Sequence, residues 1–305
     1  MSTKNAPAGG DSDARAGSPP VTDQPESPFS FRPVKEGEDL SDLMEIQYAT
    51  WGREDAVVTH QIIAALKNGG LVIGAYLGGR MAGFSYGFPG FKDGQVYLCS
   101  HMLAVLPEYR NSGLGWQLKL AQRAAALEKG YTLITWTYDP LQAPNARLNL
   151  GKLKAFTRTY VVDYYGPMAD PINAGIPSDR FVVEWPLRSP RVLATVRHTA
   201  PPGPATDQGT ARPSWTSAPK VNEMDSSGRG SVPNLSLTAP QITVVIPGRF
   251  QQLKEANLEE ARRWRQLTRE IFLHYFQRGY VATDFWGDKH RGYYLLERGI
   301  DLTII

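Results

Sequence analysis

Apolar and polar residues are distributed so that two blocks of the chain, at about 29–197 and 241–305, are expected to fold. Residues 1–28 and 198–240 are instead rich in Gly, Pro, Ser and Thr and poor in large apolar side chains. Such segments cannot bury enough apolar surface to offset the entropy of ordering the chain. We therefore expect a disordered N-terminal tail at 1–28 and a disordered linker or insertion at 198–240.

The first block is expected to alternate strands and helices. Apolar spacing indicates strands at 29–34, 71–76, 81–88, 95–105, 133–138, 160–164 and 181–187, and helices at 39–48, 57–66, 116–129 and 145–154. The pair Gly78-Gly79 is typical of a hairpin turn, and Gly130 ends a helix. The pattern predicts an α/β (α+β) fold with a mixed central sheet flanked by helices.

The second block predicts a strand at 242–246, a long helix from 251 to 278, and strands at 280–285 and 293–297. This β-α-β-β order repeats that of residues 133–187, and Tyr160-Val-Val-Asp-Tyr-Tyr-Gly166 is echoed by Tyr280-Val-Ala-Thr-Asp-Phe-Trp-Gly287. The block is either a partial duplication or a C-terminal extension that completes the core. Because so small a sheet is marginally stable alone, we expect it to dock on the first domain, 29–197.

Composition narrows the classes of function. Lys and Arg number 33 against 30 Asp and Glu, and a net charge of +3 gives no argument for a nucleic-acid or membrane partner. The single cysteine, Cys99, cannot form an internal disulfide, which suits a reducing cytoplasm. No apolar run is long enough for a membrane span, and none resembles a signal peptide. The five histidines show no metal-ligand spacing, so we expect a cytoplasmic protein without a metal.

The segment Arg110-Asn111-Ser112-Gly113-Leu114-Gly115 carries the strongest chemical signal. It lies between a predicted strand and a predicted helix, where glycines let successive backbone N–H groups converge on one oxygen-rich ligand. The start of the helix adds the positive end of its dipole, which suits a pyrophosphate. The segment lacks the Gly-Lys-Ser/Thr ending of a P-loop and the Gly-x-Gly-x-x-Gly of a dinucleotide fold. An ordinary glycine turn that caps a helix remains the alternative.

The pattern Arg110-x-x-Gly113-x-Gly115, after the strand 97–105, resembles the acyl-CoA-binding motif of the Gcn5-related N-acetyltransferases (GNAT). The resemblance covers about 31–190, and Asp139-Pro140-Leu141 and Asn145-Ala146 are similar to a branch described as predicted acetyltransferases. It implies a GNAT fold and an acyl-CoA co-substrate, acetyl-CoA or another thioester. The residues that it implies for coenzyme binding are Leu103, Ala104, Val105, Arg110, Asn111, Ser112, Gly113, Leu114, Gly115 and Asn145.

The family's reaction is direct attack of an amine on the thioester, which needs a base and a proton donor for the departing thiolate. The resemblance makes His101 the first candidate for the base and Glu108 the second. Cys99 lies two residues from His101, on the same face of an ideal strand, so a Cys–His nucleophile pair is an alternative.

The family's helix tyrosine has no counterpart here, because Gly151 and Lys152 stand near its place. Tyr165 is our candidate for the acid, and water is the alternative donor. Other tyrosines that could substitute are Tyr138, Tyr160 and Tyr164.

Arg147 and Arg180 lie where the resemblance places the acceptor cleft, and a guanidinium there suits a carboxylate. We therefore expect an N-acyltransferase that acts on a small amine or amino acid, with acetyl or succinyl as the acyl group. A catalytically weak CoA-binding module is the alternative function, and a homodimer is an alternative to a monomer. The basic residues of the helix 251–278 interleave with glutamates, which is typical of a solvated face.

Overall fold

The computed structural model describes residues 27–168, 174–196 and 211–302. The expected tail at 1–28 lies outside the described residues except for its last two positions, as do residues 198–210 of the expected linker.

The first part of the chain alternates strands and helices, much as its apolar spacing predicts. Its elements are β1 (Ser30–Pro33), α1 (Ser41–Trp51), α2 (Thr59–Lys67), β2 (Leu71–Leu77), β3 (Arg80–Lys92), β4 (Gln95–Val105), α3 (Leu114–Glu128), β5 (Leu133–Tyr138), α4 (Ala143–Ala146), a π-helix (Arg147–Lys152), β6 (Phe156–Val161), β7 (Arg180–Pro186) and α5 (Pro190–Val196). A 3₁₀ turn (Pro107–Tyr109) joins β4 to the loop before α3.

The second part forms β8 (Gln241–Pro247), α6 (Phe250–Ala256), α7 (Leu258–Gln277), β9 (Tyr280–Gly287) and β10 (Arg291–Arg298). The sequence predicts one long helix where the structure has α6 and α7. The break falls at Asn257, whose backbone is extended and whose side chain accepts a hydrogen bond from Glu260 N at 3.0 Å. Asn257 thus caps α7, and the interruption is a local capping effect that apolar periodicity does not report.

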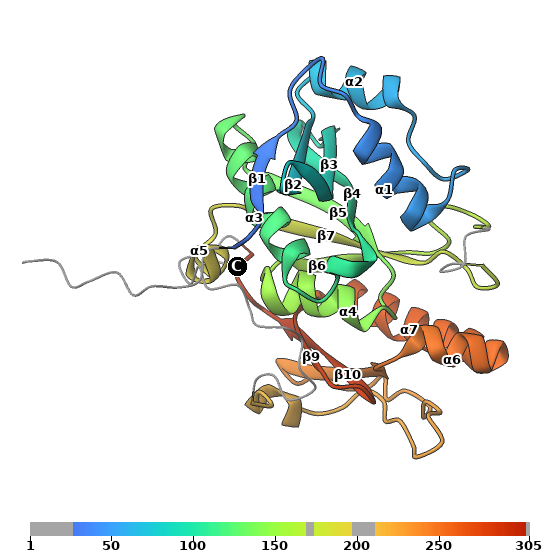
Figure 1. Cartoon of the computed structure of the whole chain (residues 1–305). Helices are drawn as coiled ribbons and strands as arrows, with labels where there is room; N and C mark the ends of the chain where they lie inside the picture. Colours follow the sequence, from blue (N-terminus) through green and yellow to red (C-terminus); the bar gives the residue numbers. More distant parts are fainter. Residues whose placement is uncertain (1–26, 169–173, 197–210, 303–305) are drawn as a thin grey trace, which may run out of the picture.

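Within the described residues, ten strands form one sheet in the order β1-β2-β3-β4-β5-β7-β6-β9-β10-β8 (Figure 1). All neighbours pair antiparallel except β4 and β5, which pair in parallel. Two apolar clusters cover the sheet. The smaller joins α1 and α2 to β3 and the end of β4, and the larger includes residues of α3 and α7. This arrangement confirms the predicted mixed α/β fold.

The C-terminal strands continue the sheet, and their order reverses that of the preceding unit. The order β5-β7-β6 is followed by β9-β10-β8, and the two units meet where Thr157 of β6 pairs antiparallel with Ala282 of β9. Each unit has the chain order strand, helix, strand, strand. Partial duplication stays an interpretation, and the repeated order of strands is the observation that favours it.

Residues 211–240 differ from the disordered linker that the sequence predicts, because they pack on the C-terminal unit. Val221 and Asn222 are buried, and the Asn222 side chain bonds the Val245 backbone through both its oxygen and its nitrogen, at 2.9 and 3.0 Å. Carbonyl groups of the segment accept hydrogen bonds from Trp264 Nε1 and the Tyr275 hydroxyl. Partners supplied by later residues hold the segment, so its own composition does not reveal it.

Candidate functional site

A gap between β4 and β5 forms the central cavity of the first domain. The two strands pair only at Leu98–Ile134 and Cys99–Thr135, and beyond these positions they diverge. The cavity has a volume of about 370 Å³. It is lined by residues of α1, β4, α3, β5, α4 and β7, among them Trp51, His101, Leu103, Lys119, Trp136, Thr137, Asn145 and Arg180.

A β-bulge in β4 sets which side chains face each side of the gap. The register between β3 and β4 shifts where Gly87 pairs with Ser100 and Tyr86 pairs with Met102, so His101 is the extra residue. Before the bulge Leu98 packs in the larger cluster with α3, whereas after it Met102 packs in the smaller cluster with α1. The even-numbered residues of β4 therefore face α3 before the bulge and α1 after it, and this change falls where the sheet opens.

His101, the expected base, lies at this bulge on the α1 side. Its imidazole packs edge-on against the Tyr86 ring at 6.2 Å and near the Phe88 ring at 5.7 Å, while part of it stays accessible. His101 is exposed as a residue, but these neighbours partly desolvate its ring and so lower its pKa below the usual value. The ring is therefore neutral at neutral pH and can accept a proton. Burial raises the pKa of the Cys99 thiol, which disfavours the thiolate that a Cys–His pair would use.

The loop before α3 presents unpaired backbone donors. Asn111 and Gly113 adopt the left-handed conformation, with φ of 62° and 86°. The backbone N–H groups from Asn111 through Gly115 have no hydrogen-bond partner among the described residues, and the last two begin α3. A run of free amides at the start of a helix is a site for an anion.

The other residues expected at the coenzyme lie along one path. Leu103 lines the cavity, and the position of a Cβ on Gly115 lies 3.8 Å from Leu103 Cδ2, so the loop adjoins the open end of the gap. Arg110 Nε donates to the Val105 carbonyl at 3.2 Å, and the Ser112 hydroxyl donates to the Tyr109 carbonyl at 2.6 Å. These contacts fold the loop back on the end of β4. Ala104 is buried beside Phe84 of β3, and Leu114 begins α3.

Asn145 lies on α4 at the wall of the cavity. It is exposed, and its side chain has no hydrogen-bond partner among the described residues. An amide group in that position can bond a passing amide of a ligand in either sense.

The acceptor candidates separate into two places. Arg180 begins β7 and lines the cavity, where its guanidinium donates to the Asp179 carbonyl at 3.0 Å and stands 5.4 Å from the Tyr165 ring centre. The Tyr165 hydroxyl lies 3.1 Å from Thr137 Oγ1, which places Tyr165 at the rim. Arg147 instead donates to the Gly287 carbonyl of β9, and it does not line the cavity. Glu108 is exposed in the 3₁₀ turn and also lies outside the lining.

The C-terminal unit leaves no room for a side chain at Gly151 in the segment after β5. A Cβ on Gly151 would lie 2.9 Å from the Phe285 carbonyl oxygen of β9, so a side chain there would collide with the docked strand. Tyr138 and Tyr160 are buried and their hydroxyls are engaged, by Tyr294 at 3.3 Å and by Asp179 at 2.6 Å. Burial raises the pKa of both tyrosines, which makes them poor proton donors.

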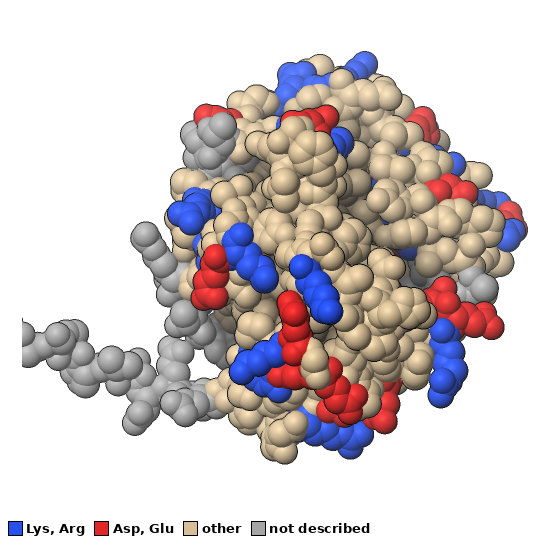
Figure 2. Space-filling view, turned by 90° about the horizontal axis from the view of Figure 1, so that it is seen from above, with Lys and Arg blue, Asp and Glu red and all other residues tan. Residues whose placement is uncertain are grey.

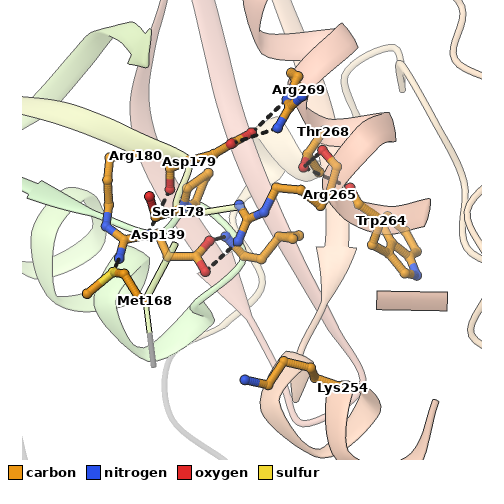
Figure 3. A network of polar contacts seen from close by, with 12 residues as sticks. Asp139, Met168, Ser178, Asp179, Arg180, Lys254, Trp264, Arg265, Thr268 and Arg269 are labelled. Carbon is orange, nitrogen blue, oxygen red and sulfur yellow. Dashed lines mark hydrogen bonds and ion pairs between the residues drawn. The ribbon is translucent and has the colours of Figure 1, made fainter. Parts of the chain in front are cut away.

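Buried ion pairs join the cavity wall to α7, and the sequence does not predict them. Figure 3 shows Arg265 and Arg269 extending from α7 toward Asp139 and Asp179. Arg265 Nη2 lies 2.6 Å from Asp139 Oδ2, and Arg269 Nη2 lies 2.8 Å from Asp179 Oδ1. Burial raises the pKa of Asp179, but hydrogen bonds from Arg269 and Tyr160 outweigh burial and lower it overall. The arginines can be recognised in the sequence as a basic helix, but their partners cannot.

Lys119 of α3 is a second residue of the cavity wall that sequence reasoning missed. Its side chain is 2% exposed, and its ammonium nitrogen lies inside the wall. Only its polar character within an amphipathic helix could have drawn attention to it.

Charges on the outer surface are mixed. In Figure 2, Lys and Arg stand among Asp and Glu on the face shown, and Arg263 of α7 pairs with Glu259 at 2.6 Å. No helix in the described part of the chain is long and apolar enough to cross a membrane. Within the same residues, no group of three or more His, Cys, Asp and Glu side chains is placed to hold a metal ion.

Comparisons with known proteins show what the region around this site is similar to. Residues 38–148 match the model of the acetyltransferase (GNAT) family. Similar solved structures include a GNAT family acetyltransferase from Elizabethkingia anophelis with acetyl-CoA bound, at 14% identity over 53% of this chain and 99% of that chain, with a TM-score of 0.40. The ribosomal-protein-S18-alanine N-acetyltransferase from Escherichia coli is 17% identical over 52% of this chain and 94% of that chain, with a TM-score of 0.42. No curated protein matches the chain.

Proposed function

We propose that the GNAT acetyltransferase domain at residues 38–148 transfers an acyl group from an acyl-CoA to a small amine or amino acid, by direct attack on the thioester. The family match over residues 38–148 supports acyl transfer from CoA, and the site supports the choice of acceptor and acyl group. The donor is acetyl-CoA, with succinyl-CoA as the second candidate.

The run of unpaired amides from Asn111 through Gly115 carries the proposal. They suit the pyrophosphate of CoA, and the pantetheine arm would follow β4 from Val105 past Leu103 into the gap. Asn145, on the opposite wall, would bond an amide of that arm. The thioester then lies near the β-bulge, within reach of His101.

The two sides of the bulge separate donor from acceptor. His101 faces the α1 side with Trp51, which also lines the cavity, so an amine entering there meets a neutral imidazole before it reaches the thioester. The imidazole would take the proton that makes the amine nucleophilic, directly or through water. Arg180 at the same cavity suits a carboxylate on the acceptor, which supports an amino-acid-like substrate.

Calorimetry with CoA tests the donor site. Gly113→Asp would place a carboxylate among the phosphate-binding amides and is expected to abolish binding. Gly94→Asp is the matched control, because Gly94 has φ of 78° in the β3–β4 turn, close to the 86° of Gly113, and does not line the cavity. Equal affinity of CoA for the folded Gly113→Asp variant and the control would refute the placement.

Release of free thiol from acetyl-CoA or succinyl-CoA, measured over a panel of amines and amino acids, tests the transfer. Turnover with an amino acid and its loss in Arg180→Gln would support the proposed acceptor. If CoA binds but no amine is acylated, the chain is instead a CoA-binding module.

A further inference from the structure

The closed end of the gap contains a buried amine. The β4 and β5 strands converge at Leu98 and Cys99, and the wall there includes Ser100, Lys119 and Trp136. A coenzyme arm that enters from the loop at 111–115 and follows β4 toward the bulge brings its sulfur end to this part of the cavity. Lys119 therefore stands where the reacting end of the donor would arrive.

Polar and aromatic groups hold Lys119 without a counter-charge. Its ammonium donates to Ser100 Oγ at 3.0 Å and to Gln122 Oε1 at 2.9 Å. It lies 3.8 Å from the centre of the Trp136 ring and 5.5 Å from that of Trp185. No carboxylate among the described residues forms an ion pair with it. Burying an amine without a carboxylate beside it costs free energy of folding. The hydrogen bonds to Ser100 and Gln122 fix the direction in which the Lys119 side chain points.

Lys119 and His101 lie on opposite sides of the opening. Ser100, to which Lys119 donates, precedes the bulge, and its neighbour Leu98 packs with α3. His101 packs with Tyr86 on the α1 side. The amine of Lys119 is thus on the side of the coenzyme arm, and the imidazole is on the side of the acceptor.

We propose that Lys119 is a catalytic residue that donates a proton to the coenzyme sulfur as the thioester breaks. The inference rests on the proposed function and assigns the acid that the segment after β5 lacks, because Gly151 cannot carry a side chain beneath β9.

The step balances in atoms and charge. The acceptor nitrogen bonds the thioester carbon, the carbon–sulfur bond breaks, and its electron pair goes to sulfur. A proton passes from the Lys119 ammonium to that sulfur, which gives free CoA. The neutral acceptor amine loses one proton to His101 or water, that proton passes on to solvent, and solvent returns a proton to Lys119. The products are an amide and a thiol, with no net change in protons.

The surroundings of Lys119 suit an acid that works near neutral pH. Burial lowers its pKa to about 7, and a negative charge on Cys99 of β4 would raise it. Cys99 acts on this pKa through its charge, although its side chain lies on the other face of β4 from Ser100. The groups in contact with the amine are uncharged: β5 and β7 present Trp136 and Trp185, and α3 presents Gln122. An acid with a pKa near the working pH combines a substantial protonated fraction with ready donation.

Titrating the thiol of bound CoA tests whether Lys119 lies beside the sulfur, and the test needs no acceptor amine. Ultraviolet absorbance of the thiolate, followed against pH with CoA bound to the full chain, gives the pKa of that thiol. We expect it to lie about 1 to 3 below that of free CoA, because a cation within about 4–6 Å stabilises the thiolate by this amount. The amine and thiol titrate as a coupled pair, so the value belongs to the pair.

Three variants make the titration specific. Lys119→Met is expected to return the bound thiol to a pKa at or above that of free CoA, while Lys119→Arg keeps it low because the positive charge remains. Lys129→Met is the matched control, since Lys129 is exposed at the end of the same helix and should change nothing. Circular dichroism establishes that each variant is folded.

The outcomes separate this inference from the proposed function. If the wild-type chain binds CoA by calorimetry but its thiol titrates as in free CoA, Lys119 is not the acid, and the function stands. Identical titration curves for Lys119→Met and wild type would overturn the role of Lys119 in the same way. If CoA does not bind to the wild-type chain, both are overturned.

Discussion

Replacing Arg265 by Met should remove a large part of the stability of this fold. Arg265 lies on α7, and its side chain is 1% exposed against 6% for Asp139, its partner at 2.6 Å. Removing the guanidinium would leave a buried carboxylate with no cation, and breaking such a pair costs about 3–5 kcal/mol. Since a folded domain is stable by only about 5–15 kcal/mol, the loss would be about a fifth of the total or more.

Urea denaturation followed by tryptophan fluorescence measures this loss. With a slope of about 2–3 kcal/mol per molar urea, the midpoint should fall by about 1–2 M. Arg263→Met is the matched control, because Arg263 is on the same helix and its side chain is 57% exposed. Its pair with Glu259 is worth less than about 1 kcal/mol, and its second partner, Glu260 at 3.5 Å, keeps Arg229 at 4.0 Å when Arg263 is replaced.

A double-mutant cycle isolates the pair itself. Asp139→Asn removes the charge but keeps an oxygen that can accept the Leu141 N–H, which Asp139 Oδ1 now accepts at 2.9 Å. The combination with Arg265→Met should be more stable than the sum of the single losses predicts, by about 0.5–3 kcal/mol. Equal urea midpoints for Arg265→Met and Arg263→Met would refute the reasoning, because the Arg265–Asp139 pair would then contribute no more to stability than an ion pair on the surface.

Three further outcomes follow from the site. Because desolvation lowers the pKa of His101 and only its neutral ring accepts a proton, kcat/KM for an accepted amine should rise with pH on its acidic limb, with a midpoint below about 6.5, and should fall where Lys119 loses its proton, above a pH of about 7. His101→Gln should lose the acidic limb and about 10²–10⁴ in rate. Above a pH of about 7 the unfolded chain binds more protons at Lys119 than the folded chain does, so the free energy of unfolding should rise by about 2 kcal/mol between pH 7 and 9 relative to that of Lys119→Met. The same change of unfolding free energy with pH in both proteins would contradict this. Gly151→Tyr should cost about 1–3 kcal/mol in urea denaturation through its collision with Phe285, and faster turnover at unchanged stability would speak against that contact.

Local signals were sufficient for most of the fold. The strand at 95–105 and the strand at 133–138 have in the structure the bounds that their apolar patterns predict, because both are bounded by turn residues. The strand predicted at 160–164 lies earlier, at Phe156–Val161, where a register shift between Thr157 and Thr159 breaks the alternation of apolar and polar residues. The helix predicted at 145–154 is a short α4 followed by a π-helix, whose packing against β9 no local pattern records.

The candidate site also has features that the sequence predicts and features that it does not. Glycine spacing and the start of a helix predicted the loop at 111–115, since its chemistry is in its own backbone. Arg147 looked like a substrate residue, yet its guanidinium bonds the Gly287 carbonyl, which lies far along the chain. Lys119 gave no signal, because an amine in an amphipathic helix reads as a solvated residue until the fold turns it toward Ser100. The sequence therefore predicts local backbone conformation, whereas it does not predict side-chain contacts between residues that are far apart in the chain.

Because β6 pairs with a strand that is made later, its edge stays unpaired during part of the synthesis of the chain. The strands from β1 to β7, with the loop at 111–115, leave the ribosome while β9 has yet to be made. Until then β6 presents an open row of backbone donors and acceptors, the kind of surface through which nascent chains associate wrongly. The last strands of the chain therefore close an edge that the earlier ones leave exposed, and a ribosome that stalls before β9 would release a protein prone to aggregate.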